Sequence, residues 1–271
     1  MKKIAPGVGV TRVRLSVGVL ELFRFEGYAH AFPRHAHERF TFGVFGSRNG
    51  SIRVRGSEWK ASPGAILAIA PEEIHSAEPL PRNGWTYRSL YPSAEVVAAA
   101  LGTGLGRLPR FGRPVIHDPG LAGAIERLHL RLEQTPDVAG AEERVLVLIR
   151  KLATRHGMGW AEPKEDAATG VVARARGFLE EHAAEPVRLR ALSAHCGVSP
   201  FYLIRSFHRV LGVTPHAWLT QLRANRARAM LQGGEAPTTV AYRCGFSDQS
   251  HLTRTFRDIF GVTPGAYVKG G

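Results

Sequence analysis

The spacing of hydrophobic residues changes along the chain. From about residue 15 to residue 91, short β-branched and aromatic runs such as RFTFGVF, SIRVRG, AILAIAP and WTYRSLY are broken by Gly, Pro and Asn. Several short strands at this spacing are typical of a β-sandwich or a β-barrel. The first part of the chain is therefore expected to form a barrel-like β domain.

Helical spacing replaces the strand pattern further on. Residues 121–132 and 141–154 repeat apolar residues every three or four positions, the pattern of amphipathic helices. The stretch GMGWAEPKEDAATG is polar and shows neither period, which indicates a linker. The rest of the chain reads as helices separated by short loops with Gly, so the fold class is α+β with an all-α second domain. The predicted boundaries are 1–156 for the β domain with its trailing helices, 157–170 for the linker and 171–271 for the α domain.

The α domain contains an internal repeat. The segments SAHCGVSPFYLIRSFHRVLGVTPHAWL and AYRCGFSDQSHLTRTFRDIFGVTPGAYV are two copies of one pattern. Cys196-Gly197 recurs 48 residues later as Cys244-Gly245, whereas the matched residues after the turn recur 49 residues later. One extra residue is therefore expected at the start of the second long helix.

Each copy has the parts of a helix-turn-helix unit. A short helix, a tight turn with Gly and a longer helix follow one another, and Ser199 and Ser247 are suited to cap the two longer helices. Thr-Pro pairs after each unit predict one more helix each time, and the helix at 215–231 would join the two units rigidly. Apolar residues at i, i+4 and i+7 of the long helices are predicted to face the core. These are Leu203 and Phe207 in the first helix, and Leu252, Phe256 and Ile259 in the second.

Charge supports a polyanionic partner for this domain. The chain carries 36 Lys and Arg against 23 Asp and Glu, a net charge of +13. From residue 187 onward, 11 basic residues face only 3 acidic ones, so a net charge of +8 lies in the helix-turn-helix region. Such an excess is the expected footprint on DNA phosphates, although exposed arginines on a plain helical bundle would give the same count. The predicted DNA contacts are Ser199, Pro200, Phe201, Ile204, Arg205, Gln249, Ser250, His251 and Arg254.

The repeat resembles the AraC/XylS family of bacterial transcription regulators. The segment AYRCGFSDQSHLTRTFRDIFGVTP is very similar to that family's signature for its second helix-turn-helix unit, and the resemblance spans about residues 171–268. It implies two recognition helices that enter successive major-groove faces of one DNA site, where base edges carry the full donor and acceptor code.

The first domain resembles the cupin-type barrel that many members of this family use to sense an effector. Metal-binding cupins have an H-x-H pair, a carboxylate soon after it and a later His; His35, His37 and His75 match, but Thr41 and Phe42 replace the carboxylate. Glu38 is predicted to point to the opposite face. A three-His site for a divalent metal stays open. The favoured interpretation is a pocket lined by these residues, with no cofactor. The effector-site candidates are His35, His37, His75, Trp85, Tyr87 and Ser89.

Two surfaces keep alternative interpretations. The alternating face of WTYRSLY, which also includes Tyr91, either offers an aromatic wall for a ligand or forms plain core. The two amphipathic helices correspond in position to dimerisation helices of family members, and otherwise simply cover the barrel. The candidate dimerisation residues are Leu121, Ile125, Leu128, Leu132, Val145, Leu148, Ile149 and Leu152.

The sequence therefore predicts a DNA-binding transcriptional regulator and not an enzyme, with no catalytic residues. Its expected partners are a double-stranded operator, a small-molecule effector, a second copy of the chain and, for an activator, RNA polymerase. The alternatives are a cupin metalloenzyme or metal sensor fused to a DNA-binding domain, and a non-specific DNA binder. Only Cys196 and Cys244 occur, and they are expected to pack in the core. No signal peptide or apolar run of about 18 residues is apparent, which predicts a cytoplasmic protein without a membrane partner.

Overall fold

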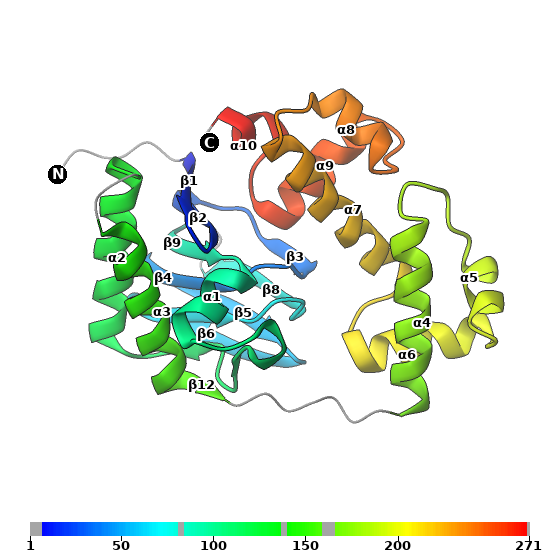
Figure 1. Ribbon diagram of the computed structural model, residues 1–271, viewed down its shortest axis with the longest axis horizontal. Helices are drawn as coiled ribbons and strands as arrows, with labels where there is room; N and C mark the ends of the chain where they lie inside the picture. Colours follow the sequence, from blue (N-terminus) through cyan, green and yellow to red (C-terminus); the bar gives the residue numbers. More distant parts are fainter. Residues whose placement is uncertain (1–6, 81–83, 137–139, 159–165, 270–271) are drawn as a thin grey trace. The chain divides into compact units, whose positions relative to one another are not determined.

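The computed structural model describes residues 7–80, 84–136, 140–158 and 166–269. The chain divides into two compact units, Met1–Ala161 and Glu162–Lys269, which run from blue to green and from yellow-green to red in Figure 1. Residues 159–165 of the predicted linker lie outside the described residues. Its two ends differ from the prediction, because residues 157–158 form a short strand and residues 167–170 already belong to a helix.

Antiparallel sheets form the body of the first unit, which agrees with the predicted β domain and the α+β class. The six-stranded sheet has the order β1 (Gly7–Leu15), β2 (Gly18–Tyr28), β9 (Trp85–Pro92), β4 (Thr41–Ser47), β7 (Ile66–Ile69) and β11 (Val115–Ile116). The four-stranded sheet has the order β3 (Phe32–His35), β8 (His75–Leu80), β5 (Asn49–Val54) and β6 (Ser57–Ala61). A short third pair joins β10 (Arg110–Phe111) to β12 (Gly157–Met158).

Strand β4 shows how the large sheet buries both of its faces. Phe42 and Val44 belong to the hydrophobic core that also contains the helices, whereas Thr41 and Phe45 line a cavity between the two sheets. Successive side chains of a strand point to opposite faces, so these two sets separate by parity. A strand that is buried on both sides needs a nearly continuous apolar run, which RFTFGVF supplies.

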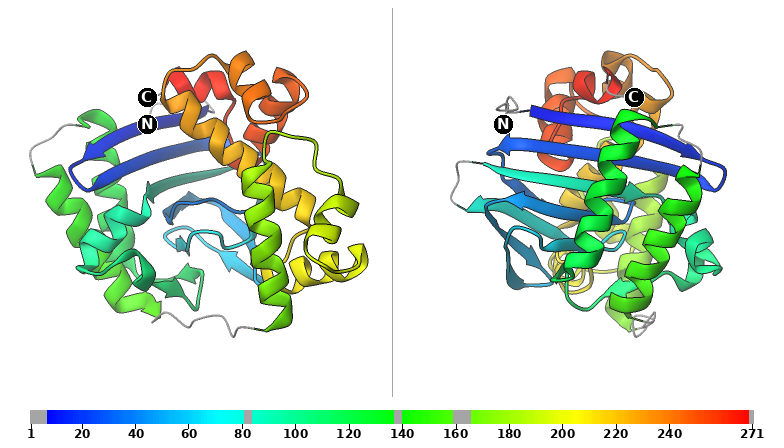
Figure 2. Two further views of the ribbon diagram at one scale, coloured as in Figure 1. Left: turned by 45° about the vertical axis from the view of Figure 1, so that its right-hand side comes forward. Right: turned by 90° about the vertical axis from the view of Figure 1, so that its left-hand side faces the viewer.

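Helices α2 (Pro119–Gln134) and α3 (Ala141–His156) cover the outer face of the six-stranded sheet (Figure 2). Two shorter helices precede them, α1 (Ala94–Leu101) and the 3₁₀ helix η1 (Leu105–Arg107). All eight residues predicted for dimerisation are buried within this unit, and Ile125, Leu132, Val145 and Leu152 have no exposed surface at all. Their apolar faces therefore cover the barrel, which was the alternative interpretation of the pattern.

The second unit is helical throughout its described residues. Its elements are α4 (Ala167–Glu181), α5 (Leu189–His195), α6 (Pro200–Leu211), α7 (Pro215–Gln232), α8 (Pro237–Arg243), α9 (Gln249–Phe260) and α10 (Pro264–Lys269). The hydroxyl oxygens of Thr214 and Thr263 each accept a hydrogen bond from a backbone N–H three residues later, at 3.1 and 3.2 Å, as N-cap residues do. The predicted joining helix is confirmed as α7. Among the described helices of both units, none has the length and apolar composition that crossing a bilayer requires.

Candidate DNA interface and effector cavity

The first recognition helix, α6, is held by its apolar face. Leu203 and Phe207 have no exposed surface and pack in the core of this unit, as predicted. The Ser199 hydroxyl caps the helix by accepting a hydrogen bond from the N–H of Tyr202 at 3.2 Å, and Pro200 follows at the first helical position. This orientation turns the opposite stripe of α6 toward solvent.

An aromatic and a cationic side chain dominate that outward stripe. The Phe201 side chain is 68% exposed, and the Arg205 guanidinium lies 5.6 Å from the centre of its ring. Ile204 is half-buried at the edge of the same face. The exposed ring and the guanidinium beside it make this stripe of α6 a candidate binding surface.

The second recognition helix, α9, begins one residue later than predicted. Asp248, not Ser247, caps it, because the Asp248 carboxylate accepts a hydrogen bond from the N–H of His251 at 2.7 Å. The extra residue of the second copy therefore lies in the turn after Gly245 and not at the start of the helix. As a result Ser199 and Asp248, 49 residues apart, begin the two helices at equivalent positions.

The outward stripe of α9 consists of polar and cationic residues. Gln249, Ser250 and Arg254 are exposed, and the Gln249 side-chain oxygen accepts a hydrogen bond from the Thr238 hydroxyl of α8 at 2.8 Å. His251 is half-buried, since its ring packs edge-on against Phe246. The predicted contact residues thus lie on outward faces, with Pro200, Ile204 and His251 half-buried.

Two residues on the same stripes were missed by the sequence interpretation. His208 and Arg257 are exposed and follow Arg205 and Arg254 by three residues, which places them one helical turn further along. They are also 49 residues apart, so the repeat itself carried the signal.

Helix α7 contacts both helix-turn-helix units. The Arg223 side chain donates hydrogen bonds to the carbonyl oxygens of Ala183 and Glu185, both at 2.7 Å, in the segment after α4. The Arg228 side chain is 4% exposed and its guanidinium lies 5.0 Å from the ring centre of Phe260 in α9. Arg223 and Arg228 therefore contribute to the positive charge of this domain and also stabilise the packing of α7 against the rest of it.

Both cysteines are buried, as expected for packing residues. The Cys244 thiol lies 3.5 Å from the sulfur of Met230, and burial raises its pKa to about 11. Cys196 is also buried and its pKa is raised by the same cause.

A small cavity lies between the two sheets of the first unit. Its volume is about 30 Å³, enough for one or two water molecules. Four predicted effector-site residues, His35, His75, Trp85 and Tyr87, line it, whereas His37 and Ser89 do not. The Ser89 hydroxyl lies 3.5 Å from the Phe23 carbonyl oxygen. The buried indole N–H of Trp85 has no hydrogen-bond partner among the described residues. The remaining lining residues are Phe25, Phe32, Thr41, Phe45, Ile52, Leu67, Ala77 and Tyr91.

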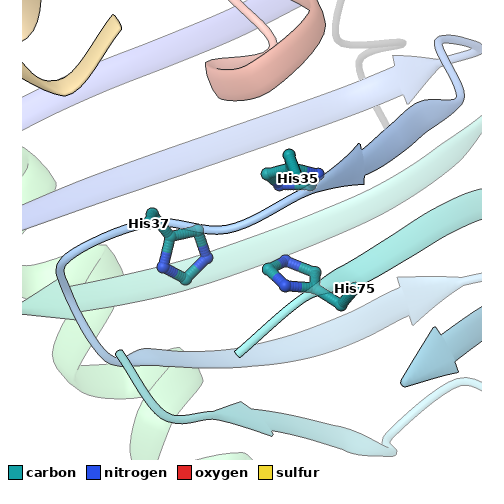
Figure 3. A group of neighbouring side chains, drawn as sticks. All are labelled: His35, His37 and His75. Atoms are coloured by element: carbon teal, nitrogen blue, oxygen red, sulfur yellow. The ribbon is translucent and has the colours of Figure 1, made fainter. Parts of the chain in front are cut away.

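The three predicted histidines come together at this cavity (Figure 3). His35 and His75 are paired partners across β3 and β8, and His37 follows in the connection to β4. Each ring is buried, and each Nδ1 atom lies 2.7 to 2.8 Å from a backbone carbonyl oxygen. Desolvation, with the neighbouring His75, lowers the pKa of His35 to about 3, and desolvation lowers the pKa of His75 to about 4. These two rings are therefore neutral at pH 7, while Glu38 is exposed as predicted.

Comparison with known proteins agrees with this two-unit arrangement. Residues 17–149 match the AraC-like ligand binding domain, and residues 192–270 match a helix-turn-helix domain. The chain is 31% identical over 240 residues to the HTH-type transcriptional regulator YbfI of Bacillus subtilis, and the similarity covers 86% of each chain. The chain belongs to the AraC family of transcriptional regulators.

This AraC-family regulator has further relatives that agree with its fold and function. It is 28% identical over 252 residues to the HTH-type transcriptional activator RhaS of Citrobacter koseri, with 86% of each chain covered. Its fold is similar to that of ToxT from Vibrio cholerae, with a TM-score of 0.58, 12% identity and 97% of each chain covered. The protein is thus a DNA-binding transcriptional regulator and not an enzyme.

Proposed function

We propose that this regulator reads its operator with the outward stripes of α6 and α9, and that Arg205 and Arg254 make the principal contacts. The observation that carries the proposal is the equivalence of these two exposed arginines, 49 residues apart, on helices whose opposite faces are fully buried. A guanidinium can form a bidentate pair with a guanine edge in the major groove, and it can also anchor a phosphate.

The two roles of an arginine predict different binding data. If Arg254 reads a base, Arg254→Ala costs about 1–3 kcal/mol on the operator and relaxes the preference at one base pair. If it contacts phosphate, affinity falls on all sequences and the salt slope drops by about one unit. Arg205→Ala should disturb positions roughly 10 base pairs from those of Arg254→Ala, because the two helices belong to one rigid unit.

The test is a titration of each variant against single-base operator variants at two salt concentrations. Arg209→Ala serves as a comparison on α6, because the Arg209 side chain lies one turn beyond Arg205 but already pairs with both carboxylate oxygens of Asp166 at 2.7 Å. Wild-type affinity in both Arg205→Ala and Arg254→Ala would contradict the assignment of the DNA-facing surface.

The barrel cavity is the proposed effector site. Its wall combines aromatic rings with the imidazoles and with the unpartnered Trp85 N–H, a composition that suits a small, partly polar ligand. A structure of ToxT carries an unsaturated fatty acid, which supports ligand binding in a protein of this fold. The cavity is only about 30 Å³, so an effector as large as a fatty acid could enter only if the aromatic wall moved.

Dimerisation, contact with RNA polymerase for an activator, and a cytoplasmic location complete the proposal. The apolar residues that α2 and α3 expose are Leu130 and Val147, at 37% and 44%. They line a groove of about 510 Å³ between the two helices, and its rim carries Arg127, Arg131, Arg144 and Lys151. Of the eight predicted residues, Leu128 and Leu148 also line this groove, so the candidate contact between two copies consists of the exposed residues together with these two.

A further inference from the structure

Three imidazole rings gather out of solvent at the proposed effector cavity: His35 and His75 line it, and the His37 ring packs against both of theirs. None of His35, His37 and His75 is more than 6% exposed, and one ring nitrogen from each lies within 4.8 Å of those of the other two. The pairing of β3 with β8 sets His35 directly opposite His75, and His37 lies two residues beyond His35. Figure 3 shows the three rings around one common space.

The backbone fixes the tautomer of each ring. The Nδ1 atoms of His35, His37 and His75 lie 2.7, 2.7 and 2.8 Å from the carbonyl oxygens of Pro33, Arg39 and Glu73. A carbonyl oxygen only accepts, so each Nδ1 must carry the hydrogen, and a neutral ring then has its lone pair on Nε2. Metal-ligating histidines are commonly oriented in this way, with the other ring N–H donated to a backbone carbonyl.

We propose that His35, His37 and His75 bind one divalent transition-metal cation, with Zn²⁺ as the reference ion, through their three Nε2 atoms. Tetrahedral Zn²⁺ with Zn–N bonds of about 2.0–2.1 Å needs nitrogens about 3.4 Å apart, so metal binding would draw the rings closer than the present limit of 4.8 Å. Neutral imidazoles suit zinc, copper, nickel and iron. Three protein ligands leave at least one coordination position for a small molecule.

The ligand set indicates the chemistry of that small molecule. Three neutral imidazoles leave the full charge of the cation in a buried cavity, where an uncompensated charge is costly. A carboxylate or hydroxide as the fourth ligand would lower that cost. The cavity wall includes Thr41, whose hydroxyl lies 2.9 Å from His37 Nε2 and can bond to such an anion. The role as an effector anchor rests on the proposed effector cavity, whereas cation binding does not.

Cobalt titration tests the site without DNA or effector. Full-length protein without a histidine tag is stripped with a chelator and titrated with Co²⁺. One equivalent should give the intense visible absorption of a tetrahedral ion, Zn²⁺ should displace it, and added azide should shift the bands by occupying the open position. Unchanged bands with azide would overturn the open position. Absence of a stoichiometric cobalt spectrum, together with no rise in melting temperature with Zn²⁺, would overturn the site whatever the variants do.

Single substitutions locate the cation. His35→Gln and His75→Gln should each weaken cobalt binding at least tenfold, because even the loss of a group that only orients a ligand costs about 10–100-fold. His117→Gln is the matched control, because His117 is an exposed histidine of the same unit and should keep wild-type binding. Equal binding by His75→Gln and wild type would overturn the proposal. A His117→Gln variant that loses the cation would overturn it as well, since the ligand would then be a surface imidazole.

Discussion

Gly245 lies against the backbone of Ala184: a Cβ atom on Gly245 would stand 2.8 Å from the Ala184 carbonyl oxygen. Gly245 belongs to the turn of the second helix-turn-helix unit, and Ala184 lies between α4 and α5, just before the first unit. Its equivalent in the repeat, Gly197, has no atom within 4 Å of the same position. Both glycines have positive φ, +79° and +67°.

This difference predicts unequal effects of the same substitution. Gly197→Ala should cost about 1–2 kcal/mol, because only the left-handed backbone conformation is strained. Gly245→Ala should cost more and should also weaken operator binding, because the clash separates the two units. Thermal unfolding and DNA titration of both variants make the test. Equal losses of stability with unchanged DNA affinity would show that the contact does not fix the spacing of the two recognition helices.

The cap of α9 gives a second prediction. Asp248→Ala should lower the melting temperature, because the N–H of His251 loses its acceptor, whereas Ser247→Ala should have a smaller effect. Ser199→Ala in the first unit is the positive control for removing a cap. A larger loss in Ser247→Ala than in Asp248→Ala would restore Ser247 as the first residue of the helix.

A third prediction concerns acid sensitivity of the first unit. His129 is 1% exposed, its Nε2 donates to the Phe23 carbonyl oxygen at 3.1 Å, and burial followed by the positive charge of Arg88 lowers its pKa to about 4. An unfolded chain binds the proton near pH 6.5, whereas the folded chain does so only near pH 4. Stability due to the neutral ring is therefore present above pH 6.5 and is lost as the pH falls toward 4.

His129→Gln removes this titration. Between pH 7 and pH 5 the wild type should lose about 2 kcal/mol more than the variant, because one buried group contributes about 1 kcal/mol per pH unit in this window. Urea unfolding at both pH values, with chelator present, measures the difference. The exposed His117→Gln should behave as wild type, and parallel pH profiles of wild type and His129→Gln would contradict the assignment.

Self-association supplies a fourth prediction. Val147→Glu should leave the fold intact and abolish any dimer, because Val147 is exposed beside the groove between α2 and α3. Leu132→Glu should instead lower stability, because Leu132 is fully buried against the barrel and does not line the groove. Sedimentation and thermal unfolding separate the two effects. A Val147→Glu variant that sediments as the wild type does would exclude this groove as the interface.

The sequence predicted the helices and strands better than the surfaces against which they pack. The repeat identified both recognition helices because matched residues 49 apart keep the same buried and exposed faces. The repeat misplaced the second cap because Ser247 and Ser199 are both serines. The residue that caps the helix is the one whose side-chain oxygen accepts from the backbone N–H three residues later, and in α9 this is Asp248. Amphipathic periodicity correctly predicted α2 and α3. It could not predict what covers their apolar faces, because a helix that packs on its own sheet and a helix that packs on a second copy have the same pattern.

The cavity shows a related limit. Strand parity correctly grouped Trp85, Tyr87 and Tyr91 on one side of the sheet. Parity does not give the distance from the cavity, so it also included Ser89, which does not line it. The facing wall comes from β3 and β8, whose pairing depends on long-range closure of the barrel. His35, His37 and His75 were therefore recognisable as residues, while the distances that make them a cluster followed only from the fold.

The close approach of the Gly245 turn to the backbone after α4 has a consequence for the promoters that this regulator controls. Two recognition helices held at a fixed distance tolerate no change in the separation of their target bases, since one inserted base pair moves one target about 3.4 Å along the duplex and rotates it by about 35°. A base substitution removes only one contact. Promoters under this regulator should therefore diverge by point substitution within the two contacted segments, while the length of DNA between those segments is preserved.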